Sequence, residues 1–153
     1  MTPLRRPVEV SVEATFALRR QLLRADRPDL DLRMPDDDAV GAFHLAVLHD
    51  DGDAVGVITL TPSAPDFDAR APAYRIRQMA VAQDRQGNGI GALLFAAAVT
   101  RLRAQGVATL WAESRNTSLG FYLAHGMRVV PGRQHAVGDV PYTDVTVDLT
   151  IRA

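Results

Sequence analysis

The chain has 153 residues, 47% of them hydrophobic and 23% charged, which is enough to bury the core of one globular domain. A formal net charge of −1 gives no overall basic field for nucleic acid or an anionic membrane. The sequence has neither cysteine nor lysine, which excludes disulfides, thiolate metal sites, a cysteine nucleophile and a P-loop or Schiff-base lysine.

The first forty residues predict a strand, a helix and a loop. Residues 8–10 suit a short strand, and Ser11 can cap a helix that runs to about Arg24. Residues 26–41 are rich in Asp and Pro and are expected to form a loop. The aspartates Asp36 to Asp38 in this loop indicate a solvated turn or a helix start rather than a metal site.

The remaining sequence predicts six strands and two helices. Asp-Gly between apolar runs indicates a hairpin, and Gly56 in its second strand indicates a bulge. The helix that follows the glycines at 87, 89 and 91 has an apolar face with i, i+3, i+4 spacing. It ends near Gln105, where Gly106 is a C-cap. The expected strands are residues 43–48, 54–60, 74–81, 107–113, 127–130 and 140–149, and the second helix is 118–125. This order predicts one α/β (α+β) domain over residues 1–153 with a mixed sheet.

The N-terminal residues lack the apolar core of a signal peptide, and no stretch reaches the ~20 apolar residues of a membrane span. We therefore expect a cytoplasmic protein that binds neither membrane nor nucleic acid.

A glycine-rich turn between a strand and a helix is the main functional signal. It runs from Gln86 through Gly87, Asn88, Gly89, Ile90 and Gly91 to Ala92. The first turn of a helix leaves backbone N–H groups unpaired at the positive end of the helix dipole. Glycines without Cβ atoms allow a pyrophosphate to approach these donors. The sequence therefore predicts a ligand that carries a pyrophosphate.

A dinucleotide site is the alternative for this turn. Gly87-x-Gly89-x-x-Ala92 fits the dinucleotide fingerprint, and Glu113 lies at the spacing of a ribose-binding acid. However, residues 82–86 separate the strand from the glycines, and too little chain follows to build the further strand–helix units of that fold. We therefore reject a nicotinamide-dependent reductase.

Two segments carry a resemblance to a known family. The first is Gln86-x-x-Gly89-x-Gly91, which follows the strand Tyr74–Val81 and resembles the pyrophosphate motif of the GNAT acetyltransferases. The second runs from Leu119 to Met127. It contains Phe121-Tyr122 and Gly126 and is similar to the second signature of that family. The resemblance covers roughly residues 10–149 and implies a GNAT-like domain, whose mixed, mostly antiparallel central sheet is flanked by helices. Residues 34–60 and 138–142 also resemble small bacterial GNAT proteins of the ElaA/YjcF type.

The resemblance implies an N-acetyltransferase with acetyl-CoA as co-substrate and an amine of a small molecule or peptide as acceptor. It also implies where acetyl-CoA binds, with Asn116 as a further contact one residue away from the family's position. The implied contacts are Met79, Ala80 and Val81 on the strand and Gln86, Gly87, Asn88, Gly89, Ile90, Gly91 and Ala92 in the turn. No metal is implied, and dimers common among relatives suggest a homodimer.

The resemblance assigns Tyr122 as the general acid, which protonates the leaving thiolate. Many relatives have a glutamate on the central strand as general base, whereas this strand has Arg75, Arg77 and Gln78. Glu113 is our candidate base, and the other candidates are His44, His135, Asp139 and Asp144. The missing strand glutamate leaves an alternative open, a non-catalytic acyl-CoA-binding module that regulates a partner.

Overall fold

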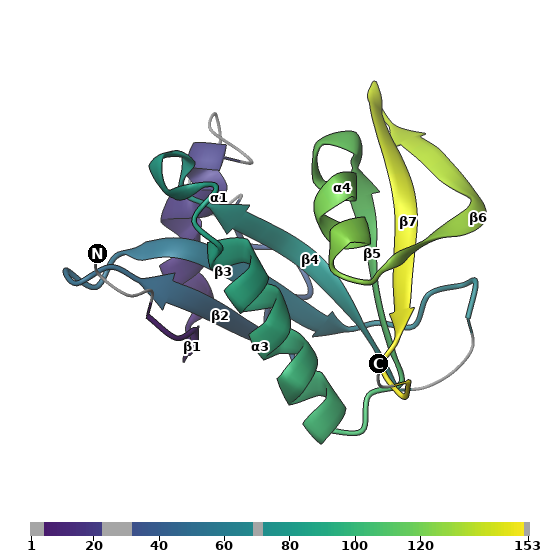
Figure 1. Ribbon diagram of the computed structural model, residues 1–153, viewed down its shortest axis with the longest axis horizontal. Helices are drawn as coiled ribbons and strands as arrows, with labels where there is room; N and C mark the ends of the chain where they lie inside the picture. Colours follow the sequence, from purple (N-terminus) through teal and green to yellow (C-terminus); the bar gives the residue numbers. More distant parts are fainter. Residues whose placement is uncertain (1–4, 23–31, 69–71, 152–153) are drawn as a thin grey trace. The chain divides into compact units, whose positions relative to one another are not determined.

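The computed structural model describes residues 5–22, 32–68 and 72–151. Its strands form a seven-stranded sheet in the order β1-β2-β3-β4-β5-β7-β6 (Figure 1). The chain divides into two compact units, an N-terminal unit (Met1–Pro62 and Arg77–Arg101) and a C-terminal unit (Ser63–Ile76 and Leu102–Ala153). The elements are β1 (Val8–Val10), η1 (Val12–Thr15), α1 (Phe16–Leu22), β2 (Phe43–Leu48), β3 (Ala54–Pro62), β4 (Ala73–Val81), η2 (Gln83–Arg85), α3 (Ile90–Ala104), β5 (Thr109–Arg115), α4 (Asn116–Ala124), β6 (Arg128–Val137) and β7 (Val140–Asp148).

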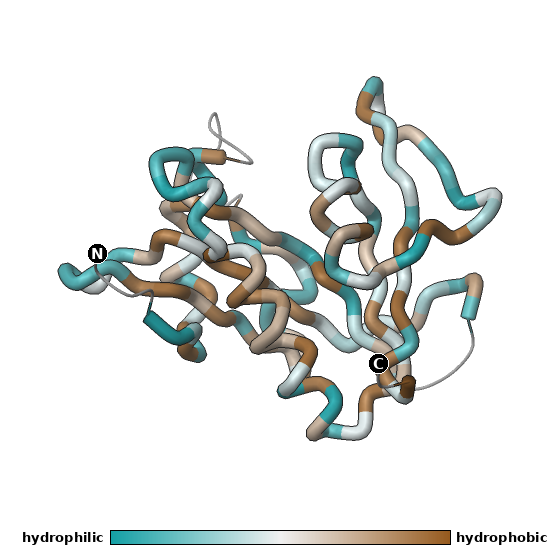
Figure 2. Tube along the Cα trace, viewed as in Figure 1, coloured by the Kyte–Doolittle hydropathy of each residue, from teal (hydrophilic) through white to brown (hydrophobic). Residues whose placement is uncertain are grey.

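In the N-terminal unit, β2 and β3 pair antiparallel, as the predicted hairpin requires, and β1 also pairs antiparallel with β2. Side chains alternate between the two faces of a strand, and Phe43–Val47 of β2 are all buried, so both faces of this strand are covered. The register between β2 and β3 shifts between Val47 and Leu48, next to Gly56, where we predict a bulge. Figure 2 shows hydrophobic segments along β2, β3 and α3, whereas the turn before α3 is hydrophilic.

Helix α3 packs on one face of this unit, and its predicted apolar side is largely buried. Ile90, Leu94 and Ala98 are almost fully buried, and Arg101 lies over the ring of Phe43 with its guanidinium carbon 3.9 Å from the centroid. A Cβ atom added at Gly56 would lie 2.4 Å from Ile90 Cγ2. Glycine is therefore required where the first turn of the helix approaches β3.

A buried polar network covers the other face of this unit. Arg19 of α1 forms an ion pair with Asp37 at 2.7 Å, and both side chains are fully buried. Arg19 also donates to Thr59 Oγ1 at 2.9 Å. The prediction that Asp36 to Asp38 form a solvated turn is therefore wrong for Asp37, because its partner comes from a helix 18 residues earlier.

The C-terminal unit contains the only parallel strand pair among the registers of the described strands. β4 and β5 pair in parallel through Ala73–Thr109, Tyr74–Leu110 and Arg75–Trp111, whereas β5 with β7, and β6 with β7, are antiparallel. The α/β class is confirmed. The expectation of a mostly antiparallel sheet is corrected to a mixed sheet, because this parallel pair lies between the antiparallel strands.

Several element boundaries differ from the predicted ones. Ser11 is at the N-cap of η1, but its side chain makes no capping hydrogen bond. The first helix is described to Leu22, so its predicted end at Arg24 lies outside the described residues. The helix predicted to start at residue 118 begins at Asn116, directly after β5 ends at Arg115. Among the described residues, the helices are too short or too polar to cross a membrane.

Candidate active site

The glycine-rich turn leads from β4 through η2 into the first turn of α3. Gly87 and Gly89 both have positive φ, at 84° and 82°, which favours glycine because a Cβ atom strains this conformation. The first α-helical hydrogen bond joins the Leu93 N–H to the Gly89 carbonyl at 3.1 Å. The amides of Ile90 to Ala92 therefore have no acceptor within the helix.

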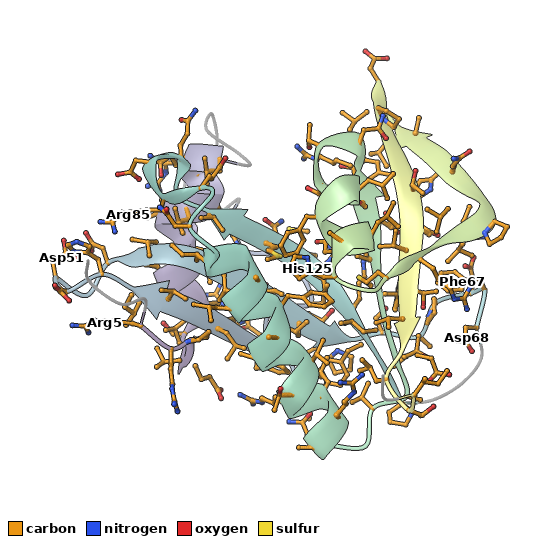
Figure 3. All side chains as sticks on the ribbon, in the orientation of Figure 1. Arg5, Asp51, Phe67, Asp68, Arg85 and His125 are labelled. Atoms are coloured by element: carbon orange, nitrogen blue, oxygen red, sulfur yellow. The ribbon has the colours of Figure 1, made fainter. Side chains whose placement is uncertain are left out.

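The turn is open to solvent. Residues Gln86 to Gly89 are exposed, and Arg85, which ends η2 just before them, is labelled in Figure 3. A Cβ atom added at Gly87 would meet nothing within 4 Å. A pyrophosphate group fits this arrangement, because the residues just before the 15-residue helix are exposed and the helix N-terminus is the positive end of its dipole.

The end of β4 is joined to the turn by a side chain. Gln86 Nε2 donates to the carbonyl of Val81 at 3.1 Å, so this amide folds back on the strand. Ala80 is buried, whereas Met79 and Val81 are half-buried. These three residues, predicted as contacts of the acyl-CoA arm, lie within the same unit as the turn.

Tyr122 is on α4 in the C-terminal unit. It is the buried residue of this helix, and its ring packs edge-on against Phe121 with centroids 5.6 Å apart. Burial raises the pKa of Tyr122 to about 12, so its hydroxyl stays protonated over the neutral range. Asn116, the weaker predicted contact, is exposed at the start of the same helix.

Glu113, the candidate base, is on β5 and is partly exposed. Arg75 of β4 lies 3.2 Å from its Oε1, and the guanidinium of Arg75 also covers the ring of Trp111. Arg75 is therefore paired within the protein. The other carboxylate oxygen, Oε2, lies 3.4 Å from His135 Nε2.

The structure brings together three of the candidate bases. Glu113 and Asp144 are paired residues on β5 and β7, and His135 on β6 lies between their carboxylates. Arg133, which the sequence does not single out, lies 3.2 Å from Asp144 Oδ2. It also covers Phe67, which is labelled in Figure 3. Only the strand register unites these residues, so no local motif reveals them.

Two other candidates are placed elsewhere. His44 lies in the buried polar network of the N-terminal unit. Its Nδ1 lies 2.8 Å from Thr59 Oγ1, which also accepts a hydrogen bond from Arg19. Its Nε2 lies 3.3 Å from the Asp37 carbonyl. A carbonyl only accepts, so Nε2 carries the proton and Nδ1 accepts from Thr59. Burial lowers the pKa of His44, which supports a neutral structural histidine. Asp139 is exposed in the turn between β6 and β7.

Comparison with known proteins identifies the relatives of this chain. A model of the acetyltransferase (GNAT) family matches residues 12–127. The uncharacterized N-acetyltransferase YitI of Bacillus subtilis (strain 168) is 29% identical over 119 residues, which cover 78% of this chain and 79% of that protein.

Solved structures show the same fold at low identity. An aminoglycoside 6′-N-acetyltransferase complexed with coenzyme A has a TM-score of 0.74 at 13% identity, and the match covers 96% of this chain and 98% of that one. The ribosomal-protein-S18-alanine N-acetyltransferase of Escherichia coli has a TM-score of 0.69 at 14% identity, with 96% of each chain covered. The narrower likeness to ElaA/YjcF proteins stays a prediction. The matched family model spans both the glycine turn and Tyr122, and the chain belongs to the GNAT acetyltransferase family, whose co-substrate is acetyl-CoA.

Proposed function

We propose that this protein transfers the acetyl group of acetyl-CoA to an amine nitrogen of a small molecule or peptide. The observation that carries the proposal is the exposed glycine turn at the start of α3, in a chain of this family. The coarser activity, acyl transfer from CoA, follows from family membership. The amine acceptor and the roles of individual residues are our proposal.

The donor is held by backbone groups. The amides from Gln86 to Ala92 bind the pyrophosphate, because those of Ile90 to Ala92 precede the first helical hydrogen bond and the residues before them are exposed. The strand residues Met79, Ala80 and Val81 bind the acyl-CoA arm, and Asn116 is a further contact. The carbonyl of Val81 already accepts a hydrogen bond from Gln86.

The chemistry is a direct transfer. The neutral amine attacks the thioester carbonyl, a C–N bond forms, and the C–S bond breaks to release the thiolate of CoA. A covalent acyl-enzyme on cysteine is excluded, because the sequence contains none.

Tyr122 supplies a proton to the leaving sulfur and recovers one from solvent. Its pKa of about 12 keeps the hydroxyl in the donor form at neutral pH. An ordinary thiol has a pKa near ~8.5, so Tyr122 is a weaker acid than the thiol it protonates. Its hydroxyl therefore donates a hydrogen bond to sulfur while negative charge develops there. The proton moves to sulfur only as the C–S bond breaks.

Glu113 accepts the proton that the nitrogen loses. The attacking nitrogen becomes positive and strongly acidic once the C–N bond has formed, so a carboxylate is a sufficient base at that stage. The Glu113 side chain is 28% exposed, and Arg75 holds one oxygen while the other stays next to the exposed His135. This arrangement supports Glu113 as the proton acceptor.

Calorimetric titration with CoA, acetyl-CoA and NADH tests the donor site. We expect acetyl-CoA to bind and NADH not to bind. The change Gly87→Ala should weaken acetyl-CoA binding by about tenfold, a loss of ~1.4 kcal/mol, because a methyl group intrudes where the phosphate approaches.

Gly52→Ala is the matched control. Gly52 has φ of 91° against 84° for Gly87, and an added Cβ meets nothing within 4 Å at either position. Both changes cause similar backbone strain, so only the ligand distinguishes them. NADH binding, or equal weakening by both variants, would contradict the proposed site. Binding without thiol release from any amine would favour the non-catalytic acyl-CoA-binding module.

A further inference from the structure

We propose that Glu113, His135 and Asp144 form a binding site for a divalent transition-metal ion of the Zn²⁺ type. We refer to these three residues as the carboxylate–histidine cluster. Each offers one ligand atom, and these atoms all lie within 4.8 Å of one another. They come from three neighbouring strands, β5, β6 and β7, of one unit. The site needs no acetyl-CoA, but it shares Glu113 with the proposed transfer, so a bound ion would occupy the carboxylate that otherwise accepts the proton.

Arginines occupy the outer oxygens of both carboxylates. Arg75 lies 3.2 Å from Glu113 Oε1, and Arg133 lies 3.2 Å from Asp144 Oδ2. The inner oxygens, Glu113 Oε2 and Asp144 Oδ1, face the imidazole of His135 at 3.4 Å and 3.9 Å. Hydrogen-bonding partners outside the ligand shell commonly hold ligating carboxylates in place, and the arginines are suited to this role.

An unpartnered buried atom points to a ligand. Among the described residues, no hydrogen-bond donor reaches Asp144 Oδ1, although the side chain is only 2% exposed. His135 Nδ1, at 3.9 Å, is too far for a hydrogen bond. A buried carboxylate oxygen without a donor is costly, and a bound cation would satisfy it.

The donor types select the class of metal. One imidazole with two carboxylates suits Zn²⁺, Co²⁺ or Mn²⁺, whereas Mg²⁺ and Ca²⁺ prefer oxygen alone. Tetrahedral zinc with bonds of ~2.0–2.2 Å places ligand atoms roughly 3.4 Å apart, so ligand atoms that now lie within 4.8 Å must approach by up to about 1.4 Å. His135 can supply the movement, because its side chain is 39% exposed.

Charge limits the affinity. The positive charges of Arg75 and Arg133 neutralise the two carboxylates of the cluster. Asp66, which is paired with Arg133, adds one negative charge. Three carboxylates and two guanidiniums give these side chains a net charge of −1, which still favours a cation. The sequence predicts no metal site, because its three ligands lie on separate strands.

Calorimetric titration of chelator-treated protein with ZnCl₂ alone tests the site. We expect one saturable site, weakened by about tenfold or more in His135→Ala and in Asp144→Asn. Magnesium should not bind there. Cobalt(II) should give visible absorption bands that His135→Ala removes.

His49→Ala is the matched control. The His49 side chain is 40% exposed and lies 3.3 Å from Asp51, and this pair belongs to no group of three metal ligands among the described residues. The His49→Ala change should leave the zinc affinity of the protein unchanged. Asp144 is buried, so circular dichroism of Asp144→Asn checks that this variant folds. His135 is on the surface, so His135→Ala should fold normally. Absence of saturable zinc binding, or equal losses in His135→Ala and His49→Ala, would overturn the proposal, whatever the transferase activity.

Discussion

Arg19 and Asp37 form a two-point ion pair that is fully buried between α1 and the segment before β2. Arg19 Nη1 donates to Asp37 Oδ2 at 2.7 Å, and Nη2 donates to Oδ1 at 2.9 Å. The Met34 N–H adds a further hydrogen bond to Oδ2 at 2.6 Å. The carboxylate therefore has strong donors on both oxygens, which offsets the cost of its burial.

Removing one partner of this pair should strongly destabilise the protein. We expect Asp37→Ala to lower the free energy of unfolding by ~3–5 kcal/mol, because Arg19 would stay buried without its counter-charge. Denaturant unfolding measures the loss. The double variant Arg19→Met, Asp37→Leu should recover much of it, because it removes both charges.

The exposed pair Arg5–Asp50 is the control, with side chains 57% and 69% exposed. Asp50→Ala should change stability little, since solvent screens such pairs. If Asp37→Ala and Asp50→Ala had equally small effects, the buried pair would not stabilise the N-terminal unit.

Acid should destabilise the same network in two steps. Burial lowers the pKa of His44, so its contribution to stability is complete above the unfolded value of ~6.5 and is lost as the pH falls toward the folded value. Burial alone would raise the pKa of Asp37, but the hydrogen bonds from Arg19 and Met34 lower it. Its contribution is therefore complete above ~3.9 and is lost below this value.

Denaturant unfolding between pH 7.5 and 4.5 measures the first step. In His44→Gln the slope of unfolding free energy against pH should become smaller in this range. His125→Gln is the control, because His125 lies in the other unit. An unchanged slope in His44→Gln would argue against a neutral buried histidine.

Tyr122→Phe should slow the transfer without weakening donor binding. We expect kcat to fall by about 10²–10⁴, the usual contribution of general acid catalysis, while calorimetry gives an unchanged acetyl-CoA affinity. Because the pKa of Tyr122 is about 12, kcat/KM should show no alkaline decline up to pH 10. Thiol release measures both quantities, and a decline between pH 8 and 10 would rule out this acid.

Tyr142→Phe provides the comparison for the loss of a hydroxyl. Tyr142 stacks on His135 with centroids 5.8 Å apart, and phenylalanine keeps this ring contact. It should retain nearly normal turnover. Similar losses in Tyr122→Phe and Tyr142→Phe would indicate a general effect on the C-terminal unit rather than proton donation.

Gly56→Ala should displace the start of α3. Its methyl carbon would lie 2.4 Å from Ile90 Cγ2 and 3.0 Å from Leu94 Cδ1, and such overpacking typically costs ~1–3 kcal/mol. Acetyl-CoA affinity should also fall, because the amides at the helix start move. In a double-mutant cycle, adding Ile90→Ala should cost less in Gly56→Ala than in the parent protein. Additive losses would show that these side chains do not compete for space.

Local patterns predicted the elements where the signal was local. The hairpin over residues 43–48 and 54–60 and the helix ending near Gln105 agree with the structure within two residues, because alternation, turn residues and helical spacing are all contained in short segments. The start of α4 was misplaced, because Asn116 follows the strand without a loop or a conventional cap.

Long-range partners were not predictable in the same way. Burial of Asp37 depends on Arg19, and the carboxylate–histidine cluster depends on the register of three strands. A sequence shows neither. The glycine turn was predictable because the residues that form it are consecutive, whereas the identity of the base was not, because β4 lacks the expected glutamate.

The direct passage from β5 at Arg115 into α4 at Asn116 has a consequence for how the chain tolerates change. A helix advances about 100° per residue, so a one-residue deletion in the first turn of α4 would swing Tyr122 by more than a quarter of a circle. A linker would absorb such a change, but none separates strand from helix. The length of this segment is therefore as strictly constrained as the identity of its tyrosine, and length variants should lose activity while point substitutions on its exposed face are tolerated.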